Sequence, residues 1–293
     1  MSQGFQLEQK ESQNKDLLPR VQRITFHTQA VERGFIPAFS GHVVRGVLSQ
    51  LLGKADKSLG DFLHEQNDRR PYAIKNVVVR DYDDRRKSRR TGDYRINAGE
   101  LFSFTVVTLG SGFTQRVVDT LFKNEEPTIQ FQAVPAIIHS VELNTVPLFE
   151  IEQSAAEGKY SVEFEMPTQF QTKEGGLMLF PELGKVFRFL GETWNALLPH
   201  HQIDLENTVY NAGKSSYVRA YHLQTREVDL GKSGRQAGFK GWMQVIIKPN
   251  EDQGLRWLPK LLKFGEIMNV GRYRTAGMGQ MTCKKRNSET QAK

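Results

Sequence analysis

Two arginines lie inside a glycine-rich segment near the C-terminal end of the sequence, where they could hold phosphate. The segment reads VGRYRTAGMGQ over residues 270–280. The planar fork of arginine donates two parallel hydrogen bonds to phosphate oxygens, and a backbone without Cβ atoms can approach an anion closely. We therefore predict that this segment binds the phosphates of a nucleic acid, through Gly271, Arg272, Arg274, Gly277 and Gly279.

Two other interpretations of the segment involve less or different chemistry. A tight connection from a helix to a strand needs glycine at positive φ, which would be a purely structural use. A dinucleotide-binding loop is disfavoured because that loop opens a helix after a strand, whereas this one follows a predicted helix and precedes a strand. The segment also lacks the lysine and the serine or threonine of a P-loop.

Further basic residues gather at two other places. The densest run is RRKSRR over 85–90, flanked by Arg69, Arg70 and Arg95, and a second group holds Lys232, Arg235 and Lys240. The net charge of +7 and the pI near 9.4 have the sign expected of a polyanion binder. We predict nucleic-acid contacts at Arg86, Arg90, Arg235 and Lys240, although a charge run is commonly only a solvated loop.

Hydrophobic periodicity predicts the elements that must position these residues. In the first half it indicates strands at 21–29, 74–80, 100–109 and 128–143, the last being one long strand or two short ones. It also indicates helices near 43–52, with Ser40 as a cap, and at 114–123. His64 falls in a short turn after the first helix. The order strand, helix, strand, strand, helix, strand is the split βαβ arrangement.

The second half repeats that order. Strands are expected at 160–166, 215–228, 239–248 and 278–284, and helices at 183–197 and 254–268. The sequence thus predicts an α+β protein of two tandem ferredoxin-like (RRM-like) domains, 19–152 and 158–285, with tails at 1–18 and 286–293. Trp194, Trp242 and Trp257 each fall on an apolar periodicity and are expected in the cores.

Composition excludes several classes of protein. Cys283 is the only cysteine, so a disulfide within the chain and a cysteine-rich zinc site are both excluded. No apolar run approaches the ~20 residues that a membrane span needs, and the first residues lack the apolar stretch of a signal peptide. We expect a cytoplasmic protein without a membrane partner.

The order and spacing of several motifs resemble one known family. These motifs are the glycine-rich segment, GFKGW at 238–242, and FEMPT at 164–168 followed by Phe180-Pro181. They resemble the CRISPR-associated repeat-RNA endoribonucleases, which belong to a wider group of RNA-binding proteins with a glycine-rich loop near the C-terminus. The resemblance covers most of the chain and is strongest over 160–284.

The resemblance implies a reaction that needs neither a metal nor a cofactor. The protein would bind precursor CRISPR RNA, cut it within each repeat, and could stay bound to the mature guide RNA. The ribose 2′-hydroxyl would attack the phosphate and expel the 5′-oxygen, which leaves a cyclic phosphate and a 5′-hydroxyl end. Such a reaction asks for a base, an acid and positive charge on the phosphorane.

By the same resemblance His64 is the preferred catalytic histidine, since it follows an aromatic-leucine pair at the family's position, and Arg70 would help to hold the phosphate. His42 is the second candidate, with capping or packing as its simpler role. Some members carry a catalytic tyrosine on the first helix where this sequence has Ser49. In members that work without histidine, arginines of the glycine-rich loop contribute, so Arg272 or Arg274 is the fallback.

Two rival functions stay open. A non-catalytic relative would serve as a structural subunit of a CRISPR effector complex and could use the same fold and loop; only His64 and its basic neighbours favour an enzyme. A general RNA-binding module of paired RRM-like sheets is disfavoured, because no segment matches the aromatic signature of that class on adjacent strands.

Overall fold

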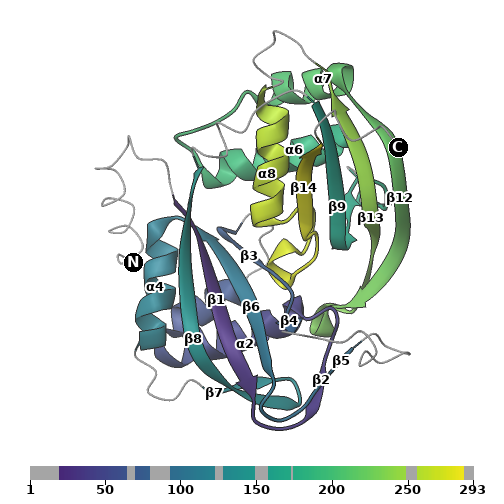
Figure 1. The fold of residues 1–293 in the computed structure, drawn as a ribbon. Coiled ribbons are helices and arrows are strands. Elements are labelled where there is room, and N and C mark those ends of the chain that lie inside the picture. Colours follow the sequence, from purple (N-terminus) through teal and green to yellow (C-terminus); the bar gives the residue numbers. More distant parts are fainter. Residues whose placement is uncertain are drawn as a thin grey trace.

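A computed structural model describes residues 20–64, 70–79, 93–122, 128–148, 158–172, 174–248 and 256–286. Two antiparallel sheets, each backed by helices, lie one above the other in Figure 1, and the glycine-rich loop lies between them. Among the described residues no helix is long and apolar enough to cross a membrane.

The N-terminal sheet has the strand order β3-β6-β1-β8-β7. Its strands are β1 (Arg20–Ala30), β3 (Tyr72–Ile74), β6 (Leu101–Leu109), β7 (Thr128–Phe131) and β8 (Val134–Pro147), and β4 (Val78–Val79) also pairs with β6. Helices α2 (Gly41–Ala55), α3 (Lys57–His64) and α4 (Ser111–Phe122) complete the domain, and a small ribbon joins β2 (Gly34–Ile36) to β5 (Tyr94–Ile96). Alternate residues of β1, such as Ile24 and Phe26, are fully buried in a core shared with Val44, Leu48 and Leu51 of α2.

The C-terminal sheet has the order β12-β13-β9-β14. Its strands are β9 (Gly158–Thr168), β12 (Ser216–Asp229), β13 (Arg235–Ile247) and β14 (Met281–Arg286). Helices α6 (Leu183–Leu197) and α8 (Trp257–Met268) pack on one face, where Trp194 meets Trp257 and Phe264 edge-on. Helix α7 (Leu205–Ser215), the short strands β10 (Phe170–Gln171) and β11 (Leu177–Met178), and the turn η3 (Gly231–Ser233) are additions to the basic unit.

In each sheet the first strand of the unit, β1 or β9, lies in the interior. Its neighbours are the third strand of the unit, β6 or β13, and the fourth, β8 or β14. This is the strand order of a split βαβ unit, so the prediction of an α+β protein with two tandem ferredoxin-like domains is confirmed. The region 128–143 forms two strands, β7 and β8, which was one of the two predicted options.

Four local predictions were wrong. The strand predicted over 74–80 is interrupted at 75–77, where Asn76 turns its amide toward helix α2. The turn predicted at His64 belongs to helix α3. Helix α7 is an omission, since no element was predicted there. Ser40 makes no side-chain cap, because its hydroxyl accepts a hydrogen bond from the amide of Val77 instead. Trp242 is 37% exposed, since it lies on the face of the sheet opposite to the helices.

Candidate functional site

The glycine-rich loop folds into a compact turn that only glycine allows at several positions. Gly271, Gly277 and Gly279 have φ values of 83°, 87° and 69°, and Tyr273 also adopts the left-handed conformation. A Cβ on Gly271 would lie 2.5 Å from the carbonyl oxygen of Gln169, which also accepts a hydrogen bond from the amide of Arg272 at 3.0 Å. The loop is therefore fixed against the end of β9 by its own backbone.

The first turn of α2 lies against this loop. A Cβ on Gly41 would lie 2.5 Å from Cα of Gly277, so the two glycines permit a backbone-to-backbone contact between the domains. Asn76 holds the contact: its Oδ1 accepts from the amides of Ser40 and Gly41 at 2.8 and 2.9 Å, and its Nδ2 donates to the carbonyl of Gly277 at 2.9 Å. Asn76 thus caps α2 and binds the loop with the same side-chain amide.

Arg274 uses its guanidinium inside the protein. The side chain is 1% exposed, and it donates to the carbonyl of Tyr72 at 2.7 Å and to the carbonyl of Arg70. These bonds tie the loop to the start of β3. In the described conformation this arginine positions the loop and does not present its charge to solvent.

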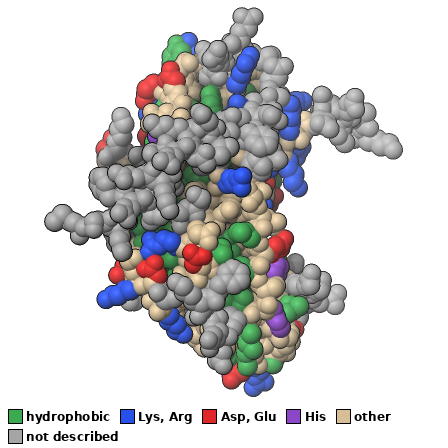
Figure 2. All heavy atoms as spheres, turned by 90° about the vertical axis from the view of Figure 1, so that its left-hand side faces the viewer, with side chains coloured by type: hydrophobic (Ala, Val, Ile, Leu, Met, Phe, Trp, Pro, Cys, Tyr) green, Lys and Arg blue, Asp and Glu red, His purple; other side chains and the backbone are tan. Residues whose placement is uncertain are grey.

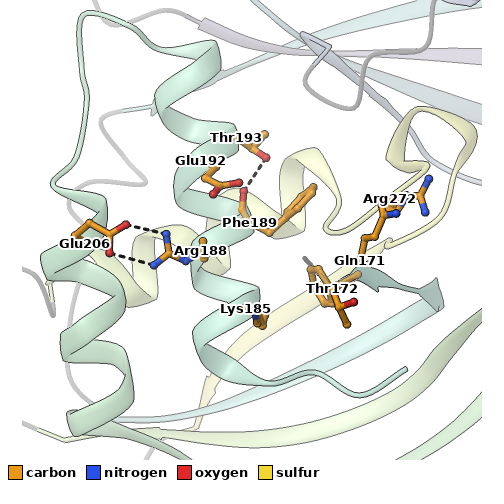
Figure 3. Close-up of a pocket in the computed structure, with 10 residues that line it drawn as sticks. Gln171, Thr172, Lys185, Arg188, Phe189, Glu192, Thr193, Glu206 and Arg272 are labelled. Atoms are coloured by element: carbon orange, nitrogen blue, oxygen red, sulfur yellow. Dashed lines mark hydrogen bonds and ion pairs between the residues drawn. The ribbon is translucent and has the colours of Figure 1, made fainter. Parts of the chain in front are cut away.

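Arg272 is the more accessible arginine of the loop. Its guanidinium lies over the ring of Tyr273 at 5.0 Å, and its Nε is buried with no hydrogen-bond partner among the described residues. It lines one end of a hollow of about 690 Å³ that also contains Gln171, Thr172 and Lys185. The ion pair between Arg188 and Glu206, at 2.8 Å, lies at the other end (Figure 3).

Arg70 is also internal, at 2% exposure. Its Nη1 donates to the carbonyl of Leu63 at 2.5 Å and lies 3.3 Å from the hydroxyl of Tyr72, and its guanidinium is 5.7 Å from the ring centroid of Phe62. Nε and Nη2 are buried with no partner among the described residues. Arg70 therefore connects the end of α3 to the start of β3.

His42, on the first turn of α2, lies at the junction of three segments. Its ring stacks on Phe39 at 5.9 Å, and Phe39 packs with Tyr273 against a small cluster formed by Leu230, Ala276 and Met278. A Cβ on Gly231 of η3 would lie 3.6 Å from the imidazole. The helix, the glycine-rich loop and the tip of the β12–β13 hairpin thus meet around this histidine.

The imidazole of His42 is only partly buried, but its Nδ1 is inaccessible to solvent and has no hydrogen-bond partner among the described residues. Burial lowers the pKa of His42, the charge of Asp229 opposes this shift, and the charge of Arg45 adds to it. The amide groups of a helix N-terminus likewise disfavour an imidazolium. His42 is therefore predominantly neutral near pH 7, which is the form that can accept a proton.

The other predicted residues lie apart from this junction or outside the described part. His64 is the last residue of α3, and its side chain, like Arg86 and Arg90, lies outside the described residues. Arg235 is exposed at the start of β13, and Lys240 is half-buried farther along that strand. Ser49 donates to the carbonyl of Gly60 at 3.4 Å and so joins α2 to α3.

Two more histidines occupy the open face of the N-terminal sheet. His27 pairs with Glu142 at 3.3 Å, and His139 lies 2.9 Å from Oε1 of Gln29. Figure 2 shows histidine side chains beside exposed hydrophobic ones on this lower part of the molecule. No group of three or more histidine, cysteine, aspartate or glutamate residues suited to a metal ion occurs within the ranges that the structure describes.

Sequence reasoning assigned His42 a capping or packing role because the glycine-rich loop beside the start of α2 is more than 200 residues away in the chain. A signal was present in Ser40-Gly41-His42, where a glycine precedes a helix at the point at which a close backbone approach would be useful. Asn76 and Arg45 were not singled out, since nothing in their local sequence points to the loop.

Comparison with known proteins adds a family to this geometry. Residues 162–281 match the family model of the CRISPR-associated endoribonuclease Cas6. No curated protein sequence matches the chain. A Cas6 product complex superposes with a TM-score of 0.70 at 16% identity, covering 91% of this chain and 100% of the other.

Further solved structures share the fold. Cas6 of Thermus thermophilus has a TM-score of 0.66 at 16% identity, with 91% of this chain and 99% of that chain covered. A Cas6-related protein from Pyrococcus furiosus has a TM-score of 0.62 at 10% identity, with 91% and 100% covered. The sequence match to the Cas6 endoribonuclease model is confined to residues 162–281, and the solved Cas6 structures share the fold of both domains with this chain.

Proposed function

We propose that this protein is a metal-independent endoribonuclease that cuts CRISPR precursor transcripts within the repeat to produce guide RNAs in the cytoplasm. The observation that carries the proposal is the position of His42, a partly exposed histidine beside Phe39 at the meeting point of α2 and the glycine-rich loop, whose pKa is lowered by burial. Solved relatives described as product and substrate-mimic complexes support RNA as the ligand.

The chemistry starts with a proton transfer to His42. The neutral imidazole accepts the proton of the ribose 2′-hydroxyl as that oxygen attacks the phosphorus. The bond between phosphorus and the 5′-oxygen then breaks, and this oxygen takes a proton from water and leaves as a hydroxyl, while the imidazolium returns its proton to the solvent. One product ends in a 2′,3′-cyclic phosphate and the other in a 5′-hydroxyl.

Positive charge for the phosphorane comes from the same junction. Arg45 lies one turn after His42 on α2, so both side chains share a face of the helix. Arg272 extends from the loop on the ring of Tyr273. A guanidinium beside the phosphate stabilises the negative charge that grows in the transition state. We assign the buried Arg274 and Arg70 to positioning the loop and β3.

His64 is the second candidate for the proton transfer. Its place after Phe62-Leu63 at the end of α3 agrees with the resemblance described above, and α3 packs against α2. We favour His42 because its ring contacts residues that surround the glycine-rich loop, whereas the described contacts of α3 are to α2, β3 and α4 through Gly60, Leu63 and Phe62.

The proposed function is tested with labelled repeat RNA and a scrambled RNA of equal length, each in excess EDTA. We expect cleavage of the repeat alone, at one position, with a 5′-hydroxyl on the downstream product. A need for added magnesium or a 5′-phosphate end would contradict the mechanism. If the protein binds the repeat tightly and never cuts it, the role of a structural subunit in an effector complex replaces that of an enzyme.

A further inference from the structure

The helix-free face of the C-terminal sheet carries an exposed tryptophan in the middle of its ladder. Trp242 of β13 is directly opposite His222 on β12 and Glu163 on β9. It is 37% exposed and stacks on no other aromatic ring among the described residues. By contrast Trp194, on the other side of the sheet, is fully buried. Exposed surface of this size on an aromatic ring is available for a partner.

Strand register defines which residues share this face. The neighbouring residues Met243 and Val245 of β13 are fully buried beneath α6 and α8, so Trp242 and Gln244 must point to the opposite side. Across the ladder Gln244 is level with Ala220 and with Ser161. The rows next to Trp242 are therefore small or polar, and the indole keeps 37% of its surface exposed between them.

The charges on the face are mainly positive. Gln224 is opposite Lys240 and Arg226 follows it on β12, so both cations are on the same face as His222. Lys284 is opposite Ser161, and Arg286 is opposite Lys159, at the other end of the face. Five cations thus accompany one carboxylate, that of Glu163, in the paired rows. Glu165, the next acidic residue on β9, is held by Gln280 at 2.7 Å.

We propose that this face, with Trp242 at its centre, binds a single-stranded segment of RNA outside the cleavage site. An unpaired base stacks on Trp242 beside His222, and the phosphates on either side of it contact Lys240 and Arg226 in one direction and Lys284 in the other. A stacking platform inside a cationic surface is the arrangement by which proteins hold single strands without reading every base. A protein partner would instead favour an apolar surface with few charges. The choice of RNA over another polyanion rests on the proposed function.

The test measures binding without cleavage, on the full chain. Two probes are used: a short, unstructured oligouridine strand, and a blunt RNA hairpin that has no single-stranded flank. We expect Trp242→Ala to weaken binding of oligouridine roughly 5- to 100-fold, which corresponds to the loss of one stacked base, and to leave binding of the hairpin unchanged. Trp242→Phe keeps an aromatic face and should retain most of the affinity.

Tyr210→Ala is the matched control, because Tyr210 is 61% exposed on α7 and lies under Lys214, away from the ladder rows. Quenching of tryptophan fluorescence by oligouridine should occur in the parent and in Tyr210→Ala, and should be lost in Trp242→Phe. Equal affinity of Trp242→Ala and the parent for oligouridine would overturn the proposal, and so would an equal loss in Tyr210→Ala.

Cleavage of repeat RNA by the parent is scored separately. Binding of oligouridine through Trp242 without any repeat cleavage would remove the proposed function and keep this surface. Cleavage of repeat RNA, with no effect of Trp242→Ala on the binding of either probe, would keep the proposed function and remove this surface.

Discussion

Asn76 and Gly277 are joined by a hydrogen bond of 2.9 Å from Nδ2 to the backbone carbonyl, across 201 positions of the chain. The Oδ1 of the same side chain accepts from two amides at the start of α2, and Asn76 is 3% exposed. One buried amide therefore sets the distance between His42 and the glycine-rich loop. The geometry of the candidate site depends on this contact between the two domains.

Removing this amide should destabilise the protein. We expect Asn76→Ala to lower the free energy of unfolding by about 2–4 kcal/mol, because several buried backbone groups would lose their partners. Urea denaturation of the RNA-free protein measures the effect. The control is Asn97→Ala, since Asn97 is exposed and its side-chain amide donates to Glu100, three residues away; it should change stability by less than about 0.5 kcal/mol. Similar values for both variants would contradict this role of Asn76.

Two glycines of α2 should respond to alanine in opposite ways. Gly41→Ala places a methyl group 2.5 Å from Cα of Gly277, so the loop must move, and we expect a loss of about 1–3 kcal/mol together with slower cleavage. Gly46→Ala meets no atom within 4 Å on an exposed part of the helix and should stabilise the protein by about 0.5–1 kcal/mol. Thermal unfolding and single-turnover rates of both variants check this, and a tolerated Gly41→Ala would show that the contact is not needed.

The pH dependence of cleavage should report the pKa of His42. Burial lowers this pKa below the usual 6.5, and the base must be neutral to work, so the rate should rise with pH and the midpoint of that rise should lie below pH 6.5. Asp229 raises the pKa, so Asp229→Asn should move the acidic limb to lower pH. Arg45 lowers it, so Arg45→Gln should move the limb to higher pH. Shifts in the opposite directions, or a limb unaffected by either variant, would exclude His42 as the titrating group.

Arg272 should contribute to affinity through a phosphate contact. Arg272→Gln is expected to weaken binding of repeat RNA and to reduce the slope of log K against log salt by about 0.7, the value for one contact on a single strand. Arg33→Gln, on the exposed turn after β1, is the control for loss of one positive charge. Filter binding across a salt series separates them; an unchanged slope for Arg272→Gln would mean that this arginine meets no phosphate.

The fold could be predicted from the sequence to the extent that each element depends on its own periodicity. Val186, Phe187, Leu190 and Trp194 recur at helical spacing and are all buried on α6. The broken strand at 75–77 could not be predicted, because its cause is the bond of Asn76 to residues that are distant in sequence. Trp242 was assigned to the core because it falls on an apolar periodicity, although its alternation with the buried Met243 places it on the open face.

The site was predictable only in part. The glycines of the loop indicated a close backbone approach, and the structure has such contacts at Gly271 and Gly277. Arg274 has the same local surroundings as Arg272 in the sequence. The two arginines differ because the carbonyls of Tyr72 and Arg70, on the other domain, lie within reach of Arg274. Arg274 is therefore a structural residue, whereas Arg272 stays near the surface.

Single-turnover cleavage of labelled repeat RNA by saturating enzyme in excess EDTA tests the central claim most directly. We expect His42→Ala to bind the repeat with nearly the affinity of the parent and to cleave it roughly 10²–10⁴-fold more slowly, the usual contribution of a positioned acid or base. His64→Ala, assayed beside it, should cleave at close to the parental rate. A parental rate for His42→Ala with an inactive, RNA-binding His64→Ala would contradict the account and assign the proton transfer to the end of α3.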